Sequence, residues 1–447
     1  MRRRASRGLA FMLAAATLPG MAVTGARDAE LLPAIREGDY ATVQALLETR
    51  AADPDHALPD GSTPLSWAVE TQDPRMVRLL LGARARPDAA RNAATAPLIV
   101  ACEHGNAEIV DLLLDAGADP SRARDDGATS LEACAASVPA AIVERLIAGG
   151  AEVDHADRDG RTALMWAAAT GRVDNIRLLV ARGADVNRAT AGGFTPLFFA
   201  LKSGHPEAPV AILDAGGDAD HVGPEHTTAV QLAMYQGDYA FAARMIERGA
   251  DVRALDRDGY TLLHAAVIAG RPELVKLLLA QGADPDAPTG KPSVEWRYEA
   301  NFKSGVVEHP AKSPLFLAAE HGSVDSMRLL AAAGADPGFR LDDGKTIVHA
   351  AISGGEAALA CALQLLPDAN VRDRKGRTPL HLLLGGSAGP ETAALMRLLA
   401  ARGARTDLAD RDGLTAAGMA ARTDTPAAMK AAYDAAFRSQ LALKTSR

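Results

Sequence analysis

The side chains best placed to do chemistry in this sequence are the carboxylates of its acidic turns. These turns resemble fragments of calcium-binding loops, in which closely spaced aspartates supply oxygen ligands. No stretch matches a complete EF-hand loop ending in glutamate, and Asp-Gly is ordinary turn chemistry, so we interpret them as structural turns. The sequence DRDG occurs at 157–160, 256–259 and 410–413.

A second candidate for chemistry is the segment DADHVGPEH (218–226), which gathers His221, Glu225 and His226. We interpret it as a solvated loop rather than a metal site. The sequence contains no G-x-S-x-G elbow, no H-E-x-x-H helix and no G-x-x-x-x-G-K-[ST] phosphate loop. Acids and serines recur at regular intervals instead of converging, so we expect no catalytic residues, no cofactor and no metal.

What does recur is one six-residue pattern. Its first seven copies begin 33 residues apart, and the following gaps are 52, 33, 32 and 37 residues. The copies are TPLSWA at 63, APLIVA at 96, TSLEAC at 129, TALMWA at 162, TPLFFA at 195, TAVQLA at 228, TLLHAA at 261, SPLFLA at 313, TIVHAA at 346, TPLHLL at 378 and TAAGMA at 415.

Each copy has the residues that begin and end a short helix. Thr or Ser can accept a backbone N–H of the first turn, and proline at the first helical position loses no hydrogen bond. Glycine nine residues after the cap, as at Gly105, lets the chain leave in a left-handed conformation. A second apolar helix follows and ends at another glycine, as at Gly117. The pattern predicts one helix–turn–helix unit per repeat.

The period, the T-P-L-H-x-A signature and the trailing G-A-D resemble those of ankyrin-repeat proteins. The resemblance implies an all-α solenoid of about twelve helix–turn–helix units with hairpin-like loops. It also implies that His264, His349 and His381 form hydrogen bonds within and between repeats. Residues 29–62 and 415–447 lack parts of the pattern, and we interpret them as the capping repeats of a solenoid over residues 27–447.

The N-terminus has the layout of a secretory signal peptide over residues 1–26. Four arginines precede an uncharged stretch, and cleavage is expected after Ala22 or Ala26. Pro19 and Gly20 interrupt the apolar run, so we expect no membrane span in the mature chain. The predicted location is the periplasm; secretion, or anchoring by an uncleaved signal, are the alternatives.

Charge and cysteines limit the possible partners. Removal of residues 1–26 would lower the formal net charge from −8 to −12, which argues against nucleic acid as a partner. We expect a monomer that binds one or more proteins. Cys102, Cys134 and Cys361 lie on predicted helices among small apolar residues, and we expect three buried thiols rather than a disulfide framework.

Five aromatic residues are candidates for partner contact. Trp67, Trp166 and Phe199 occupy the fifth position of their copies, which by resemblance lies on the inner helix toward a concave groove. Packing between repeats is the alternative. Phe194 and Tyr260 lie just before their caps, where most repeats carry small or charged residues, and are better candidates for exposed contact.

The long gap before Ser313 contains an insertion over residues 287–309. It interleaves aromatic and basic residues on an otherwise acidic protein, and tryptophan, tyrosine and arginine are enriched at binding hot spots. A variable loop folded back onto the repeats is the alternative. The candidate contact residues of the insertion are Trp296, Arg297, Tyr298, Phe302 and Lys303.

These features predict a non-enzymatic scaffold that binds a partner protein through the concave groove and hairpin loops. One alternative is an immunity or inhibitor protein that occludes another protein's active site. The other is an enzyme that uses Glu295, Glu299 and Glu308 of the insertion.

Overall fold

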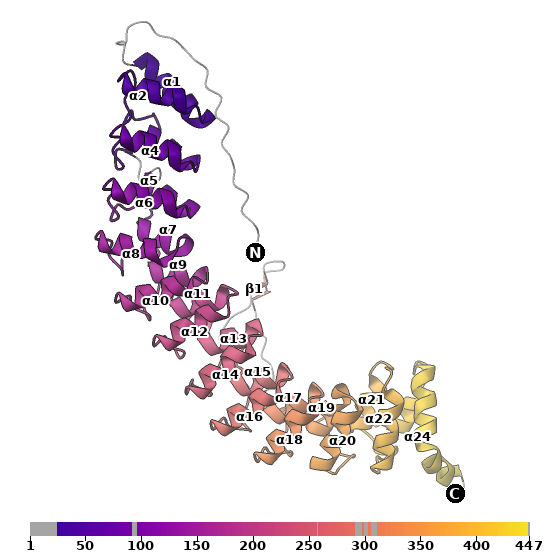
Figure 1. Ribbon diagram of the computed structural model, residues 1–447. Helices are drawn as coiled ribbons and strands as arrows, with labels where there is room; N and C mark the ends of the chain where they lie inside the picture. Colours follow the sequence, from indigo (N-terminus) through magenta and orange to yellow (C-terminus); the bar gives the residue numbers. More distant parts are fainter. Residues whose placement is uncertain are drawn as a thin grey trace. The chain divides into compact units, whose positions relative to one another are not determined.

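A computed structural model of the chain describes residues 25–91, 96–256, 258–290, 297–298, 303–304 and 311–445 (Figure 1). The chain divides into two compact units, Met1–Asp185 and Val186–Arg447. Residues 1–24, which hold most of the predicted signal peptide, lie outside the described residues.

Unit 1 consists of helices joined by tight turns. Its helices are α1 (Gly25–Glu37), α2 (Tyr40–Glu48), α3 (Pro64–Glu70), α4 (Pro74–Gly82), α5 (Pro97–His104), α6 (Ala107–Asp115), α7 (Ser130–Ser137), α8 (Ala140–Ala148), α9 (Ala163–Ala169) and α10 (Val173–Ala181).

Unit 2 is also helical and adds one short 3₁₀ turn and two two-residue strands. Its elements are α11 (Pro196–Lys202), α12 (Glu207–Asp214), η2 (Pro224–His226), α13 (Ala229–Gln236), α14 (Tyr239–Glu247), α15 (Leu262–Ile268), α16 (Pro272–Ala280), β1 (Arg297–Tyr298), β2 (Lys303–Ser304), α17 (Pro314–Glu320), α18 (Val324–Ala332), α19 (Ile347–Gly354), α20 (Glu356–Leu365), α21 (Pro379–Gly385), α22 (Thr392–Ala401), α23 (Ala416–Ala421) and α24 (Ala427–Thr445).

Within each unit the helices form two layers. The odd-numbered, first helices of successive repeats pack on one another, and so do most of the even-numbered, second helices. The described residues contain 24 α-helices, which make twelve pairs and confirm the predicted all-α repeat fold.

The predicted helix starts are confirmed. The Thr63 hydroxyl accepts a hydrogen bond from the backbone N–H of Ser66 at 3.2 Å, and the Ser66 hydroxyl accepts in return from the backbone N–H of Thr63. The same reciprocal capping box forms at Thr129, Thr228, Thr261, Thr346 and Thr378. Proline occupies the start of α3, α5, α11, α17 and α21.

The residue after the C-cap of the second helix is left-handed in nearly every repeat, and glycine occupies this position in most of them. The first two repeats differ, because Arg50 and Arg84 hold φ of 53° and 66° at that position. A left-handed conformation costs a residue with a Cβ about 1–2 kcal/mol.

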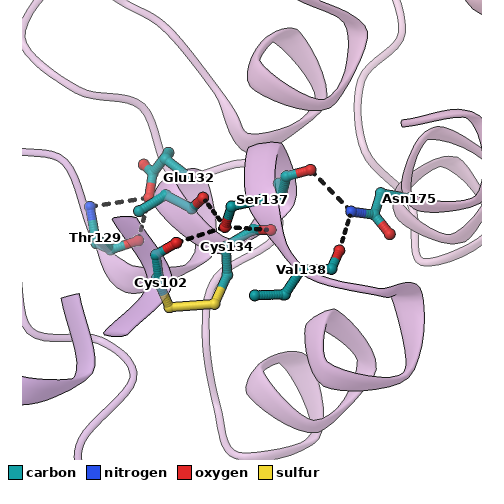
Figure 2. Close-up of a disulfide and its surroundings, with 9 residues drawn as sticks. Cys102, Thr129, Glu132, Cys134, Ser137, Val138 and Asn175 are labelled. Atoms are coloured by element: carbon teal, nitrogen blue, oxygen red, sulfur yellow. Dashed lines mark hydrogen bonds between the residues drawn. A yellow bond between two sulfur atoms is a disulfide. The ribbon is translucent and has the colours of Figure 1, made fainter. Parts of the chain in front are cut away.

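The repeat that begins at Thr129 departs from the pattern at the turn between its two helices. Val138 stands where the turn glycine belongs and is extended instead of left-handed. The side-chain amide of Asn175, in the next repeat, donates hydrogen bonds to two backbone carbonyls at this turn. It reaches Ala135 at 2.8 Å and Val138 at 2.9 Å (Figure 2). A side chain of α10 therefore replaces part of the missing turn.

The prediction of three buried thiols is wrong for two of the cysteines. Cys102 on α5 and Cys134 on α7 form a disulfide, and their Cα atoms are 4.5 Å apart (Figure 2). Their separation of 32 residues is one repeat less one residue, which places them at facing positions of neighbouring first helices. Cys361 on α20 is a buried free thiol, as predicted.

Three histidines tie one repeat to the next in unit 2. Nδ1 of His264 accepts the backbone N–H of Thr261 at 3.1 Å, and Nε2 lies 3.2 Å from the carbonyl oxygen of Lys312, the residue before the next cap. His349 and His381 make the same pair of contacts, reaching Arg377 and Leu414. The hydrogen bonds within and between repeats that the resemblance implied are therefore confirmed.

Loss of the disulfide is expected to loosen α5–α7. Cys102→Ala/Cys134→Ala should lower the local unfolding free energy by about 2–4 kcal/mol, because the cross-link restricts the unfolded chain. Hydrogen exchange of the backbone amides of α5–α7 measures this local unfolding free energy. Reductant should lower the protection of the parent protein to that of the double variant, and Cys361→Ala should still respond to reductant. Equal protection in the parent and the double variant would show that the disulfide contributes nothing.

The buried histidines predict a loss of stability in mild acid. Burial lowers the pKa of His264 and of His349 from 6.5 to about 4. The unfolded chain therefore binds more protons, and stability is lost as the pH falls from 6.5 toward 4, by up to about 3 kcal/mol per histidine.

The chain itself offers the control. Gln231 holds the same position in its repeat, accepts the cap N–H of Thr228 and donates to the Ala254 carbonyl of the following loop, without titrating in this range. His264→Gln/His349→Gln should flatten the dependence of the urea midpoint on pH in this window. An unchanged slope would show that these imidazoles are not buried in the neutral form.

Candidate partner-binding surface

The fifth-position aromatic residues pack against the residue just before the cap of the same helix. The position before the cap is N′, the fifth residue of the pattern is N4, and contact between the two is a known way of fixing how a chain enters a helix. Trp67 is half-buried, and its indole nitrogen donates to the Ser62 hydroxyl at 3.1 Å. Within each unit, we call the surface made by these paired side chains its N′/N4 face.

In the repeat that begins at Thr162, the fourth copy of the pattern in unit 1, the N′ residue is Arg161. Its guanidinium carbon lies 5.2 Å from the centre of the half-buried Trp166 ring, and its Nε donates to the buried Asp157 carboxylate at 2.6 Å. The arginine is thus held over the ring by a buried carboxylate. This arrangement presents a fixed cation and an aromatic face together.

In unit 2 the same two positions carry Phe194 and Phe199. Both rings are half-buried, and their centres are 6.4 Å apart in an edge-to-face arrangement. The centre of the buried Phe198 ring lies 6.1 Å from that of Phe194, and the Lys202 ammonium lies 4.9 Å from the centre of the Phe194 ring. Phe194 is therefore less exposed than its position before the cap suggests.

Tyr260 is also half-buried at the N′ position. Its ring centre is 6.0 Å from that of His264, in an edge-to-face arrangement. Burial, together with the carboxylates of Asp258 and Asp256, raises the pKa of the Tyr260 hydroxyl above its ordinary value. The phenol therefore stays neutral and can donate a hydrogen bond throughout the physiological range.

The insertion leaves the repeats and returns to them at one point. The backbone N–H of Thr289 donates to the Lys312 carbonyl and that of Lys312 donates to the Thr289 hydroxyl, both at 2.9 Å. The same Lys312 carbonyl receives His264, so the insertion lengthens the loop without moving the next cap.

Of the candidate contact residues in the insertion, Trp296 and Phe302 lie outside the described residues. Arg297 and Tyr298 form β1, which pairs in antiparallel fashion with Lys303 and Ser304 of β2.

Sequence reasoning missed three cations that continue the N′ positions after the insertion. Lys312, Lys345 and Arg377 precede consecutive caps and line a groove of about 790 Å³. Each is held by a carboxylate: Lys312 by Glu320 at 2.5 Å, Lys345 by Asp343 at 2.8 Å and Arg377 by Asp373 at 2.8 Å. Each of these residues lies directly before a cap, and this constant position in the sequence could have identified them.

The described residues contain no cluster of three or more histidine, cysteine, aspartate or glutamate side chains suited to a metal ion. In the 218–226 segment the Nε2 atom of His221 lies 3.0 Å from the Gly193 carbonyl oxygen, and Pro224–His226 form a 3₁₀ turn. No helix in the described part of the chain combines the length and apolar character needed to span a membrane.

Comparison with known proteins agrees with the geometry. A family model described as ankyrin repeats in three copies matches residues 31–124, 131–221, 210–289 and 315–389, more than half of the chain. The chain therefore belongs to the ankyrin-repeat family, whose repeats are generally protein–protein interaction modules. No individual curated protein matches the chain significantly.

The contact between Phe194 and Phe199 is expected to stabilise unit 2 by more than the burial of each ring alone. A double-mutant cycle with Phe194→Ala and Phe199→Ala should give a coupling of about 0.5–1.5 kcal/mol, the usual value for edge-to-face pairs. Urea unfolding of the four proteins measures it. Additive effects would show that the two rings act independently, and would leave Phe194 better explained by a contact outside the chain.

Proposed function

We propose that the protein is exported to the periplasm and acts there as a non-enzymatic scaffold that binds a partner protein. The partner is held on the N′/N4 face of one or both units and beside the insertion. In this proposal these surfaces take the part of the groove and hairpin loops in which the sequence predicts partner contact. The observation that carries the proposal is the series of side chains at one position before successive caps.

The N′ side chains suit protein recognition because they are fixed before a partner arrives. Arg161, Lys312, Lys345 and Arg377 are each held by a carboxylate, and Phe194 and Tyr260 are held by neighbouring rings. Aromatic and cationic groups that are already ordered lose less conformational entropy on binding. In unit 2 the residues before the caps are aromatic at Phe194 and Tyr260, which precede the insertion, and cationic at Lys312, Lys345 and Arg377, which follow it.

Two observations support export. The sequence of residues 1–26 has the layout of a signal peptide, and the chain contains a disulfide between Cys102 and Cys134. Disulfides persist in the periplasm and other oxidising compartments and are rare where thiols are kept reduced.

Capture of the partner in cells tests the proposal. The tagged chain is first located by cell fractionation, then crosslinked in place, purified and identified with its partners by mass spectrometry. The variants are Lys345→Glu, Phe194→Ser and replacement of residues 291–310 by a short Gly-Ser linker, which keeps the Thr289–Lys312 clamp. Arg328→Glu is the matched control, because Arg328 is an exposed cation of α18 in the second-helix layer.

We expect a periplasmic protein that captures one dominant partner. Lys345→Glu should reduce the yield of this partner at least tenfold, and Arg328→Glu should leave it unchanged. Recovery in the cytoplasm would contradict the proposed location. A partner that is lost with Arg328→Glu and kept by the N′ and insertion variants would contradict the proposed surface, and purified protein that turns over a substrate would contradict the non-enzymatic role.

A further inference from the structure

Exposed apolar side chains gather in two neighbouring repeats of unit 2. In the described part of the chain, the large apolar residues with exposed side chains are Tyr40, Val222, Tyr235, Leu255 and Ile268. All of them except Tyr40 lie on α13 and α15, or on the hairpin loops that lead into these two helices. We call these four residues the apolar patch.

The four residues occupy two equivalent positions of their repeats. Val222 and Leu255 lie six residues before a cap threonine, and Tyr235 and Ile268 lie seven residues after it. Several other repeats have alanine at these positions, so the fold does not require a large apolar side chain at either of them. The alanines are Ala123, Ala156, Ala189 and Ala409 before the cap, and Ala136 and Ala169 after it.

Contacts between neighbouring elements hold the patch together. The Tyr235 hydroxyl on α13 donates to the carboxylate of Asp256, which directly follows Leu255 in the next hairpin loop. The Leu255 side chain lies against Gly290, where a Cβ atom would come within 2.7 Å of its Cδ1. The side chains are thus positioned by the repeats and remain exposed. A group of exposed apolar side chains on one surface marks an interaction site.

The spacing of the patch matches one face of an α-helix. The helices α13 and α15 pack on one another, and packed helices lie about 8–10 Å apart. In an α-helix, residues seven apart share a face and are about 10.5 Å apart along the axis. In an extended segment, residues on one face are about 6.6 or 13 Å apart, because alternate side chains point to opposite faces. A helix therefore matches the separation of equivalent residues better than an extended segment.

The surroundings of the patch have an excess of negative charge. The helices α13 and α15 contain no acidic residue, lysine or arginine, whereas the hairpin loops 218–227 and 251–260 together contain six acidic residues and two arginines. The cations on the bordering elements already have contacts within the chain: Lys202 lies over the Phe194 ring, Arg271 lies over the Tyr239 ring and Lys312 pairs with Glu320. The charge therefore favours a basic occupant over an acidic one.

We propose that the apolar patch binds an amphipathic, basic helix of the partner protein. This inference rests on the proposed function and adds the chemistry of the partner. The helix lies along the direction in which α13 and α15 stack. Its apolar residues, spaced by three, four and seven, cover the patch, and lysine or arginine residues beside them face the carboxylates of the hairpin loops. Burial of apolar surface supplies the affinity, and the charges select a basic helix.

The site is tested with the full chain and a fluorescein-labelled peptide of about 18 residues, long enough to form a helix. Leucine occurs at every third or fourth position of the peptide, and lysine occupies the flanking positions. One control peptide has the same composition with its leucines spread around the helix, and a second has glutamate in place of lysine. Fluorescence anisotropy measures the affinity of each peptide.

The protein variant is Leu255→Ala/Ile268→Ala, which introduces the residue that other repeats have at both positions. Tyr40→Ala is the matched control, because it removes an exposed apolar side chain from unit 1. Circular dichroism should show that the double variant is folded like the parent protein.

We expect the first peptide to bind the parent protein. Its affinity should fall at least tenfold with the double variant, and either control peptide should bind the parent at least tenfold more weakly. Tyr40→Ala should leave the affinity unchanged. Equal binding of either control peptide, unchanged affinity of the double variant, or no binding of the first peptide would overturn the proposal.

Two further results would overturn the proposal in favour of another occupant. A parent protein that is dimeric in analytical ultracentrifugation, with a monomeric double variant, would assign the patch to a second copy of the chain. Peptide binding that appears only after residues 291–310 are replaced by the Gly-Ser linker would assign it to the insertion. Failure of the peptide assay, with partner capture in cells still dependent on Lys345, would overturn this site and leave the proposed function standing.

Discussion

The structure of unit 2 depends on one hydrogen-bonded relay that starts at a helix cap. A histidine three residues after the cap threonine accepts the backbone N–H of that threonine with one ring nitrogen. The other ring nitrogen reaches the carbonyl of the residue before the next cap. A single buried side chain thus closes its own helix and fixes the distance to the next one.

The relay also holds three of the residues that precede a cap. Its acceptors are the carbonyls of Lys312, Arg377 and Leu414, so the backbone of these three N′ residues is held by the preceding repeat. Because Lys312 is held in this way and is also clamped to Thr289, the insertion can be long without disturbing the next helix pair. The position of Lys312 and the point at which the insertion rejoins the repeats therefore depend on the same few hydrogen bonds.

Much of this could be predicted from the sequence, because each repeat uses local rules. Thr and Ser caps, proline at the first helical position and glycine turns are set by backbone chemistry within a few residues. Contacts between repeats were harder to predict. The Cys102–Cys134 disulfide was missed because the cysteines were judged by their neighbours in sequence, although a separation of 32 in a 33-residue repeat places them opposite each other.

The aromatic candidates show a similar limit. Phe194 and Tyr260 were expected to be exposed because of their position before the cap, and both are half-buried against rings that follow on the next helix. A residue before the cap and the fifth residue of the pattern lie close together at the start of a helix, so their spacing in the sequence could have predicted the contact between Phe194 and Phe199.

The relay is tested most directly by ¹⁵N NMR of the His264 and His349 side chains. The account predicts that at about pH 5.5, below the ordinary pKa of imidazole, both rings are neutral with the proton on Nε2. This form lets Nδ1 accept from the cap and Nε2 donate to the next repeat. Protonated rings, or neutral rings with the proton on Nδ1, would contradict the relay as the bond that joins one repeat to the next.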